Sequence, residues 1–215
     1  MKISMEAHPL LEARAFLSRF KSPLETLSSP EGILKYFALD CPAPVEAPPG
    51  TKPLVRDLLR HGGFKPTGRS KPASEYLFKA IEKGWFSPNK GINLAVDACN
   101  VVSLRSGLPI SVVDADLLEG NLSIETNPEK TEYIFNPSGQ GIDVGLLFGL
   151  KDEKGPCAGP VKDSQRTKTH GGTQQTLSIL WGTRSLPNHT ENALCWYLDL
   201  LSEAGAEIEA VDLCL

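Results

Sequence analysis

Two polar stretches of the sequence carry the side chains best suited to chemistry. The first contains Asn93, Asp97 and Asn100, which interrupt an otherwise apolar segment. On a helix, this spacing places the three side chains in one stripe on one face. Such a stripe either satisfies backbone groups in a packed core or lines a pocket, and the residues themselves leave both interpretations open.

The second stretch, residues 155–173, is a long polar loop that precedes an apolar run typical of a strand. Long polar loops on a rigid scaffold often carry function. The groups of this loop could hold a phosphate or an ester and orient a water molecule: Gly159, Asp163, Gln165, Arg166, Lys168, Thr169 and His170. The order of residues in a phosphate-binding P-loop is absent. A solvated loop without chemistry is the alternative interpretation.

Other chemical classes have weaker support in the sequence. The histidines His8, His61, His170 and His189 are far apart and lack the spacing of a metal site. There is no G-x-S-x-G nucleophile motif. The five cysteines are scattered and never form a C-x-x-C pair, which argues against a zinc site or a disulfide framework. We therefore expect no metal and no organic cofactor.

The periodicity of the remaining sequence predicts the elements that position these groups. Apolar residues at helical spacing predict helices over 6–20, 53–61, 72–84, 92–106 and 188–204. Short β-type runs predict strands over 33–39, 110–113, 122–125, 132–135, 142–148, 176–181 and 207–213. Residues 41–50 form a proline-rich connector, and 85–91 a turn-rich loop. Helices that come mainly before strands indicate an α+β fold.

The composition is that of an ordinary globular chain. It has 215 residues, 40% hydrophobic residues and a net charge of −4. No run of about 18 apolar residues predicts a membrane span, and the N-terminus lacks the pattern of a signal peptide, so we expect a cytoplasmic protein. The charge is uneven: residues 61–110 carry seven basic and three acidic side chains, whereas residues 111–215 carry seven and sixteen. A polyanion would therefore meet mainly the middle segment, unless its charges only form a solvated helix face.

The segment I-N-L-A-V-D-A-C-N-V-V-S-L-R-S-G-L-P-I-S-V-V-D-A-D, residues 92–116, resembles the tRNA-editing domain of the beta subunit of bacterial phenylalanyl-tRNA synthetase. The whole chain is similar to free-standing proteins built on that domain, with the strongest likeness over residues 73–122. The resemblance implies a three-layer α+β fold, with helices packed on a β-sandwich, and a single editing-type domain over 1–215. In that division, residues 1–50 would form a helix, a strand and a proline-rich strap, and residues 51–215 the tRNA-binding core.

The resemblance also implies an activity: hydrolysis of the ester of a mischarged aminoacyl-tRNA, in a pocket between the 92–106 helix and the 155–173 loop. Lys90 stands where the synthetase domain commonly has an arginine. Two positions depart from the family, because Ser111 replaces its pocket histidine and Gln165 its pocket glutamate. The amino acid removed could therefore differ from the tyrosine that the synthetase domain edits.

These considerations define the expected site. Asn93, Asp97 and Asn100 would shape the pocket, and Lys90, Arg166 and Lys168 would provide cations for the ribose-phosphate. Asp163, Ser111, Gln165, Thr169 or His170 would position the water, and Gly159 would contribute an oxyanion donor. The partner would be the acceptor end of a tRNA, with no membrane involved. The alternative is a non-catalytic module that binds RNA or an amino-acid-like ligand and has kept the fold.

Overall fold

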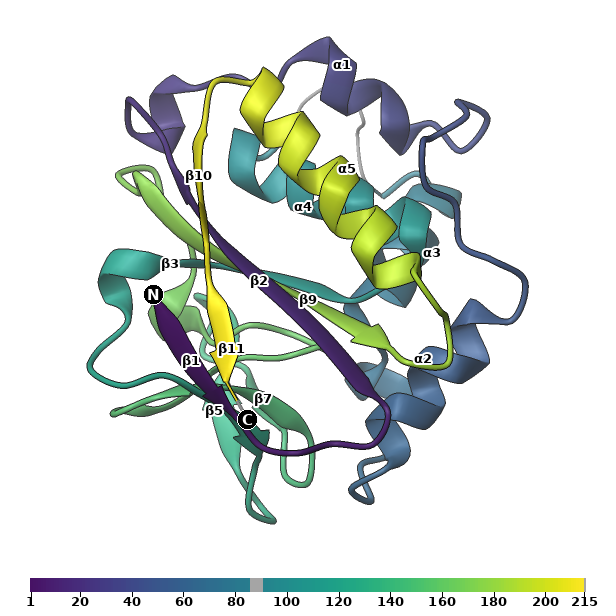
Figure 1. Ribbon diagram of the computed structural model, residues 1–215, viewed down its shortest axis with the longest axis vertical. Coiled ribbons are helices and arrows are strands. Elements are labelled where there is room, and N and C mark those ends of the chain that lie inside the picture. Colours follow the sequence, from purple (N-terminus) through teal and green to yellow (C-terminus); the bar gives the residue numbers. More distant parts are fainter. Residues whose placement is uncertain (86–90, 215) are drawn as a thin grey trace.

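Two β-sheets and the helices that cover one of them make up the computed structural model, which describes residues 1–85 and 91–214 (Figure 1). The helices are α1 (Glu31–Leu34), α2 (Thr51–Arg60), α3 (Ala73–Glu82), α4 (Leu94–Ser106) and α5 (His189–Glu203). The first strands are β1 (Lys2–Met5), β2 (Leu11–Arg19), β3 (Ile110–Asp114) and β4 (Ser123–Thr126). The others are β5 (Glu132–Ile134), β6 (Gly141–Asp143), β7 (Phe148–Asp152), β8 (Gly155–Ala158), β9 (Gln175–Thr183), β10 (Glu207–Ala210) and β11 (Asp212–Cys214).

The strands form two main sheets and a hairpin. One sheet has the order β10-β2-β9-β3 and the other β11-β1-β4-β7-β8, while β5 pairs with β6. The sheets pack against each other through Trp181 on β9 and Phe148 on β7, whose ring centroids are 5.7 Å apart. Helix α5 lies across the outer face of the β2–β9 sheet beside α4, as Figure 1 shows. The α+β prediction, with helices packed on layered sheets, is confirmed.

The predicted helix over residues 6–20 is wrong. This segment contains β2, which pairs with β10 on one side and with β9 over nine residues on the other. Both faces of β2 are covered, so Phe16 packs against Tyr197 of α5 while Leu11 and Leu17 are buried as well. Because apolar residues lie on both faces, strict alternation is lost and their spacing imitates a helix. Residues 1–50 therefore supply a central strand in place of a helical strap.

Three further predictions need correction. Residues 33–39 form the end of α1 and a 3-10 turn, Lys35–Phe37, instead of a strand. The run 142–148 is divided between β6 and β7 by a turn in which Leu146 has a φ of 65°. The closing run 207–213 is divided between β10 and β11, which belong to different sheets. The division of 207–213 arises because β10 pairs with β2 and β11 with β1, which belong to different sheets.

The predicted loop over residues 155–173 begins with strand β8, and strand β1 was not predicted. The other predictions of helices and strands agree with the structure to within a few residues. The turn-rich loop at 85–91 falls largely outside the described residues. None of the described helices is long and apolar enough to cross a membrane.

Candidate functional site

A cavity of about 520 Å³ lies between α3, α4, β3 and the segment that follows β8. Small-ligand pockets have volumes of about 300–1,000 Å³. Its apolar walls are Ala73, Leu77, Ile92, Val96, Cys99, Ile110, Val112, Phe135 and Val161. Its polar and charged groups are Tyr76, Asn93, Asn100, Asn136, Lys162, Asp163, Lys168 and Thr169. The cavity therefore combines an apolar interior with a few convergent polar groups, as binding sites do.

The structure brings five of the residues nominated from sequence to this cavity: Asn93, Asn100, Asp163, Lys168 and Thr169. They come from the start and middle of α4 and from the 155–173 loop, two segments separated by nearly fifty residues in the sequence. Asn93 is the N-cap of α4, and its Oδ1 accepts a hydrogen bond of 3.0 Å from the Val96 N–H. The half-buried side chains of Asn100 and Thr169 have no hydrogen-bond partner among the described residues. Both are therefore free to bind a ligand.

Helix α4 is positioned by its caps and by its surroundings. Asn93 begins the helix, and Gly107 ends it with a φ of 72°, a left-handed conformation that favours glycine. A Cβ at Gly107 would lie 2.9 Å from Cγ2 of Thr51, so the close approach of α2 also requires glycine there. The helix contacts α3, α5 and β3 and is buried on most sides. These contacts hold the Val96–Asn100 face against the cavity.

Asp97 belongs to the same helix but lies outside the cavity lining. Its side chain is fully buried, and its carboxylate accepts hydrogen bonds from the Ser29 hydroxyl at 2.5 Å and from the Ile92 N–H at 2.9 Å. Burial raises the pKa of Asp97, against the lowering effect of these two hydrogen bonds. The polar stripe is thus divided: Asp97 anchors the chain before α4, while the two asparagines face the cavity.

Asp163 is the acidic residue of the cavity lining. It lies beside the edge of β3 that faces away from β9, where Val113 bridges to Lys168, and its Oδ1 accepts a hydrogen bond of 3.3 Å from the Gly159 N–H. Desolvation raises the pKa of Asp163 to about 6, outweighing the lowering effects of the Ser111 hydroxyl, the Gly159 N–H and the Lys168 ammonium. A carboxyl group with this pKa is suited to accept a proton near neutral pH.

Gly159 and Ser111 lie next to the cavity and are engaged elsewhere. The N–H of Gly159 binds Asp163, so it is not a free oxyanion donor. Ser111 lies between Ile110 and Val112 on β3, and it points to the opposite face of that strand. Its hydroxyl accepts a hydrogen bond of 2.9 Å from Nε1 of Trp181 and donates one of 3.3 Å to the Gly159 carbonyl.

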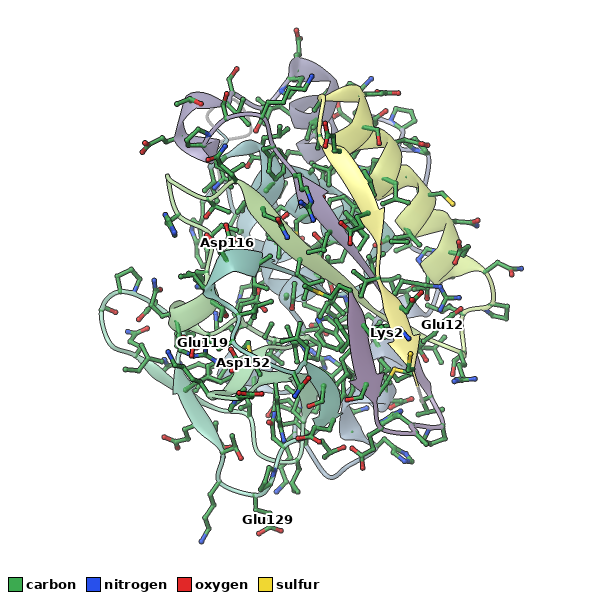
Figure 2. All side chains as sticks on the ribbon, turned by 60° about the vertical axis from the view of Figure 1, so that its left-hand side comes forward. Lys2, Glu12, Asp116, Glu119, Glu129 and Asp152 are labelled. Carbon is green, nitrogen blue, oxygen red and sulfur yellow. The ribbon has the colours of Figure 1, made fainter. Side chains whose placement is uncertain are left out.

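Arg166 is occupied by an ion pair away from the cavity. Its two terminal nitrogens each donate a hydrogen bond of 2.8 Å to the buried carboxylate of Asp152. The Glu119 N–H donates to the same carboxylate at 3.1 Å, and Figure 2 shows these two acidic residues beside each other. Although desolvation alone would raise the pKa of Asp152, the hydrogen bonds from Arg166 and the backbone lower it. This geometry makes Arg166 a structural partner of Asp152.

Gln165, His170 and Lys90 complete the residues nominated from sequence. Gln165 is outside the cavity lining, and its Oε1 is buried without a hydrogen-bond partner among the described residues. His170 is exposed, with Nε2 lying 3.2 Å from Oδ2 of Asp114. Lys90 lies outside the described residues.

Sequence reasoning did not nominate three aromatic and basic residues at the cavity. Nζ of Lys162 lies 4.6 Å from the ring centroids of both Tyr76 and Phe135. Lys168 donates a hydrogen bond to the carbonyl oxygen of Phe135. Lys162 stands within the loop already singled out by its composition, which was the available signal for it. Tyr76 and Phe135 gave no such signal, because aromatic residues in predicted elements are most simply core residues.

A larger cavity, of about 750 Å³, lies between α2, α3 and the C-terminal half of α4. None of the residues nominated from sequence lines it. Several of its charged groups are already paired: Glu75 with Arg56 at 2.6 Å, and Arg105 with Glu46. The smaller cavity is therefore the stronger candidate, because its charged residues Lys162, Asp163 and Lys168 form no ion pair among the described residues.

Comparisons with known proteins give a structural relation only. No protein-family profile matches the chain, and no curated protein matches it by sequence. Among solved structures, it is similar to an N-terminal fragment of the phenylalanyl-tRNA synthetase beta subunit from Pyrococcus horikoshii, with a TM-score of 0.50 and 10% sequence identity. The match covers 99% of this chain and 51% of the fragment, so the chain spans about half the length of that protein. At this identity, the similarity shows that the two proteins share a fold.

Proposed function

We propose that the chain is a free-standing editing hydrolase that binds the 3′ end of a mischarged aminoacyl-tRNA in the 520 Å³ cavity and removes its amino acid. The observation that carries this proposal is the convergence of Asn93, Asn100, Asp163, Lys168 and Thr169 on one cavity with apolar walls. The shared fold with a fragment of a phenylalanyl-tRNA synthetase beta subunit supports a tRNA-related function in general. In this proposal, residues 1–215 act as one domain.

Hydrolysis would use the groups that face the cavity. Asp163, as the carboxylate, accepts a proton from a water molecule that Thr169 helps to position. The resulting hydroxide adds to the ester carbonyl carbon, and the Asn100 amide and the Lys168 ammonium stabilise the oxyanion. Collapse of this intermediate breaks the bond between the acyl carbon and the ribose oxygen, which takes the proton held by Asp163 and leaves as a hydroxyl group, so that the carboxylate is restored. The products are a free amino acid and a deacylated tRNA.

The acceptor stem would bind the basic middle segment of the chain. Lys65, Arg69, Lys79 and Lys83 are exposed; Lys79 lies on α3, the helix that also supplies Tyr76 to the cavity, and Lys83 is the C-cap of this helix. Contacts of lysine and arginine with phosphates supply affinity that is independent of sequence and weakens with salt. In this proposal, the basic segment positions the tRNA and the residues of the cavity hydrolyse the ester.

A second candidate is a module that binds an RNA end or an amino-acid-like ligand without catalysis. The observation that favours it is the placement of Ser111, Gln165 and His170, which lie outside the cavity. Of the residues expected to position the water, only Asp163 and Thr169 then line the cavity among the described residues, and Asp163 is the only carboxylate. The two candidates differ in whether this carboxylate promotes turnover.

Deacylation of a panel of mischarged tRNAs separates the candidates. We expect turnover of at least one substrate, reduced about 100-fold by Asp163→Asn and about tenfold by Asn100→Ala. Asn192→Ala, an exposed asparagine of α5, is the matched control and should be unchanged. Tight binding with no turnover of any substrate would support the module and contradict the hydrolase.

A further inference from the structure

Three cations converge on Phe135 at the cavity. Nζ of Lys162 lies 4.6 Å from the centroid of its ring, and Cζ of Arg69 lies 6.0 Å from the same centroid. Lys168 reaches the carbonyl oxygen of this residue with its ammonium group. The negative face of an aromatic ring attracts cations, but it cannot neutralise their charge. Three positive charges are therefore held close together without a full counter-charge.

No carboxylate among the described residues forms an ion pair with any of these three cations. Desolvation lowers the pKa of Lys162, and repulsion from Lys168 and Arg69 lowers it further. Asp163 attracts Lys168 but does not reach it as a salt bridge. An anion bound among the three groups would remove this repulsion.

The cluster is held in place before any ligand binds. The Tyr133 hydroxyl donates a hydrogen bond to the carbonyl oxygen of Lys162, and the Ala73 N–H donates one of 2.9 Å to that of Pro160. The Tyr76 hydroxyl donates to the Gly68 carbonyl at 3.0 Å, next to Arg69. Backbone anchors on both sides thus fix the two segments that carry Arg69 and Lys162. Preorganised charges lose less conformational entropy when they bind a ligand.

We propose that Arg69, Lys162 and Lys168 form a phosphate-binding site at the cavity, with the Tyr76 and Phe135 rings holding the Lys162 ammonium in position. The ligand class is a nucleotide phosphate placed beside the apolar interior. That this phosphate is the 3′-terminal phosphodiester of an RNA rests on the proposed function. That the three cations bind a phosphate rests only on their positions and charges.

Isothermal titration calorimetry with three probes tests the site: adenosine, 5′-AMP and the trinucleotide CCA. We expect both phosphate-bearing probes to bind more tightly than adenosine, and the trinucleotide to bind most tightly. Lys162→Met and Arg69→Met should each weaken trinucleotide binding about tenfold and lower the slope of log affinity against log salt by about 0.7. Neither variant should change the affinity for adenosine.

Lys35→Met is the matched control, because Nζ of Lys35 also lies over a tyrosine ring, 4.8 Å from the Tyr36 centroid, away from the cavity. It should leave all three affinities unchanged. If Lys162→Met prevents folding, Arg69→Met still tests the site, since the Arg69 side chain is exposed. Equal affinities for adenosine and the two phosphate-bearing probes, or a uniform loss for all three in Lys162→Met, would overturn the proposal.

The results separate this site from the proposed hydrolase. If 5′-AMP binds as tightly as the trinucleotide, the phosphate site stands and its ligand is a free nucleotide. Phosphate-dependent binding without deacylation of any mischarged tRNA would contradict the hydrolase and leave the site intact. If the protein deacylates a mischarged tRNA, and neither Lys162→Met nor Arg69→Met changes this activity at low or high salt, the hydrolase is supported and the phosphate site is refuted.

Discussion

At the scale of single residues, the ionised carboxylate of Asp163 lowers the free energy of unfolding at neutral pH. Its pKa of about 6 in the folded protein exceeds the ordinary value of 3.8 because burial disfavours the carboxylate. Between these values, the folded state binds more protons than the unfolded state. The contribution of Asp163 to the free energy of unfolding therefore falls as the pH rises from about 4 to about 6.

Asp163→Asn should remove this pH dependence. Relative to the wild type, the variant should gain about 1–3 kcal/mol in free energy of unfolding between pH 4 and pH 7.5. Urea unfolding of both proteins at the two pH values measures the change. A difference between variant and wild type that stays constant with pH would contradict the assigned environment of this carboxyl group.

Arg166 should contribute to stability and not to ligand binding. Arg166→Met leaves the Asp152 carboxylate buried without its cation and should lower the free energy of unfolding by about 3 kcal/mol. The control is Arg60→Met, which breaks the exposed pair with Asp57 and should cost less than about 1 kcal/mol. Urea unfolding measures both. If Arg166→Met is fully folded and still loses deacylation, Arg166 would instead have a direct role in the cavity.

At the scale of elements, strand β3 contributes side chains both to the cavity and to the core between the sheets. Ile110 and Val112 line the cavity, while Ser111 binds Trp181 between the sheets. Adjacent residues of one strand thus serve the cavity and the core, because successive side chains point to opposite faces.

Substitutions at adjacent positions of β3 should therefore have different effects. Ser111→Ala leaves Nε1 of Trp181 without its acceptor and should lower the free energy of unfolding by about 1–2 kcal/mol. Because the hydroxyl also lowers the pKa of Asp163, the pH profile of deacylation should move to higher pH, while kcat should fall far less than in Asp163→Asn. Val112→Ala removes part of the cavity wall and should raise KM. Steady-state kinetics together with urea unfolding distinguish the two. Loss of kcat in a folded Ser111→Ala variant would place this hydroxyl in the chemistry after all.

At the scale of the whole molecule, basic and acidic residues concentrate in different parts of the chain, so a polyanion would be attracted to one part and repelled by another. Exposed cations lie in the segment before α3, at Lys65 and Arg69, and near its C-terminal end, at Lys79 and Lys83, whereas acidic residues dominate after residue 111. Figure 2 shows Asp116 and Glu119 on one side of the molecule. If the chain binds a tRNA as proposed, an RNA that approaches the acidic side would be repelled, so productive encounters would occur over residues 65–83.

Reversal of two charges on α3 and just beyond its end should slow association with tRNA. Lys79→Glu combined with Lys83→Glu should lower the association rate constant about tenfold at roughly 50 mM salt. Lys2→Glu combined with Lys21→Glu changes the net charge by the same amount at other exposed positions and should have a smaller effect. Stopped-flow measurements at several salt concentrations test this. Equal slowing by both pairs would mean that net charge alone matters.

The sequence by itself determined the elements whose signals are local. Helix α4 carries its own N-cap in Asn93 and its own stop in Gly107, and the polar loop after β8 is evident from composition. These signals act over a few residues, so they can be recognised without knowledge of the fold. The α+β class and two of the cavity walls followed from them.

Only the tertiary structure decided the identity of β2, the orientation of Ser111 and the partner of Arg166. Each depends on a contact between residues far apart in the sequence: β2 with β9, Ser111 with Trp181, and Arg166 with Asp152. The convergence of Lys162, Lys168 and Arg69 on Phe135 is of the same kind. Burial and pairing set the free energy of these arrangements, and no local pattern encodes which distant partner will be present.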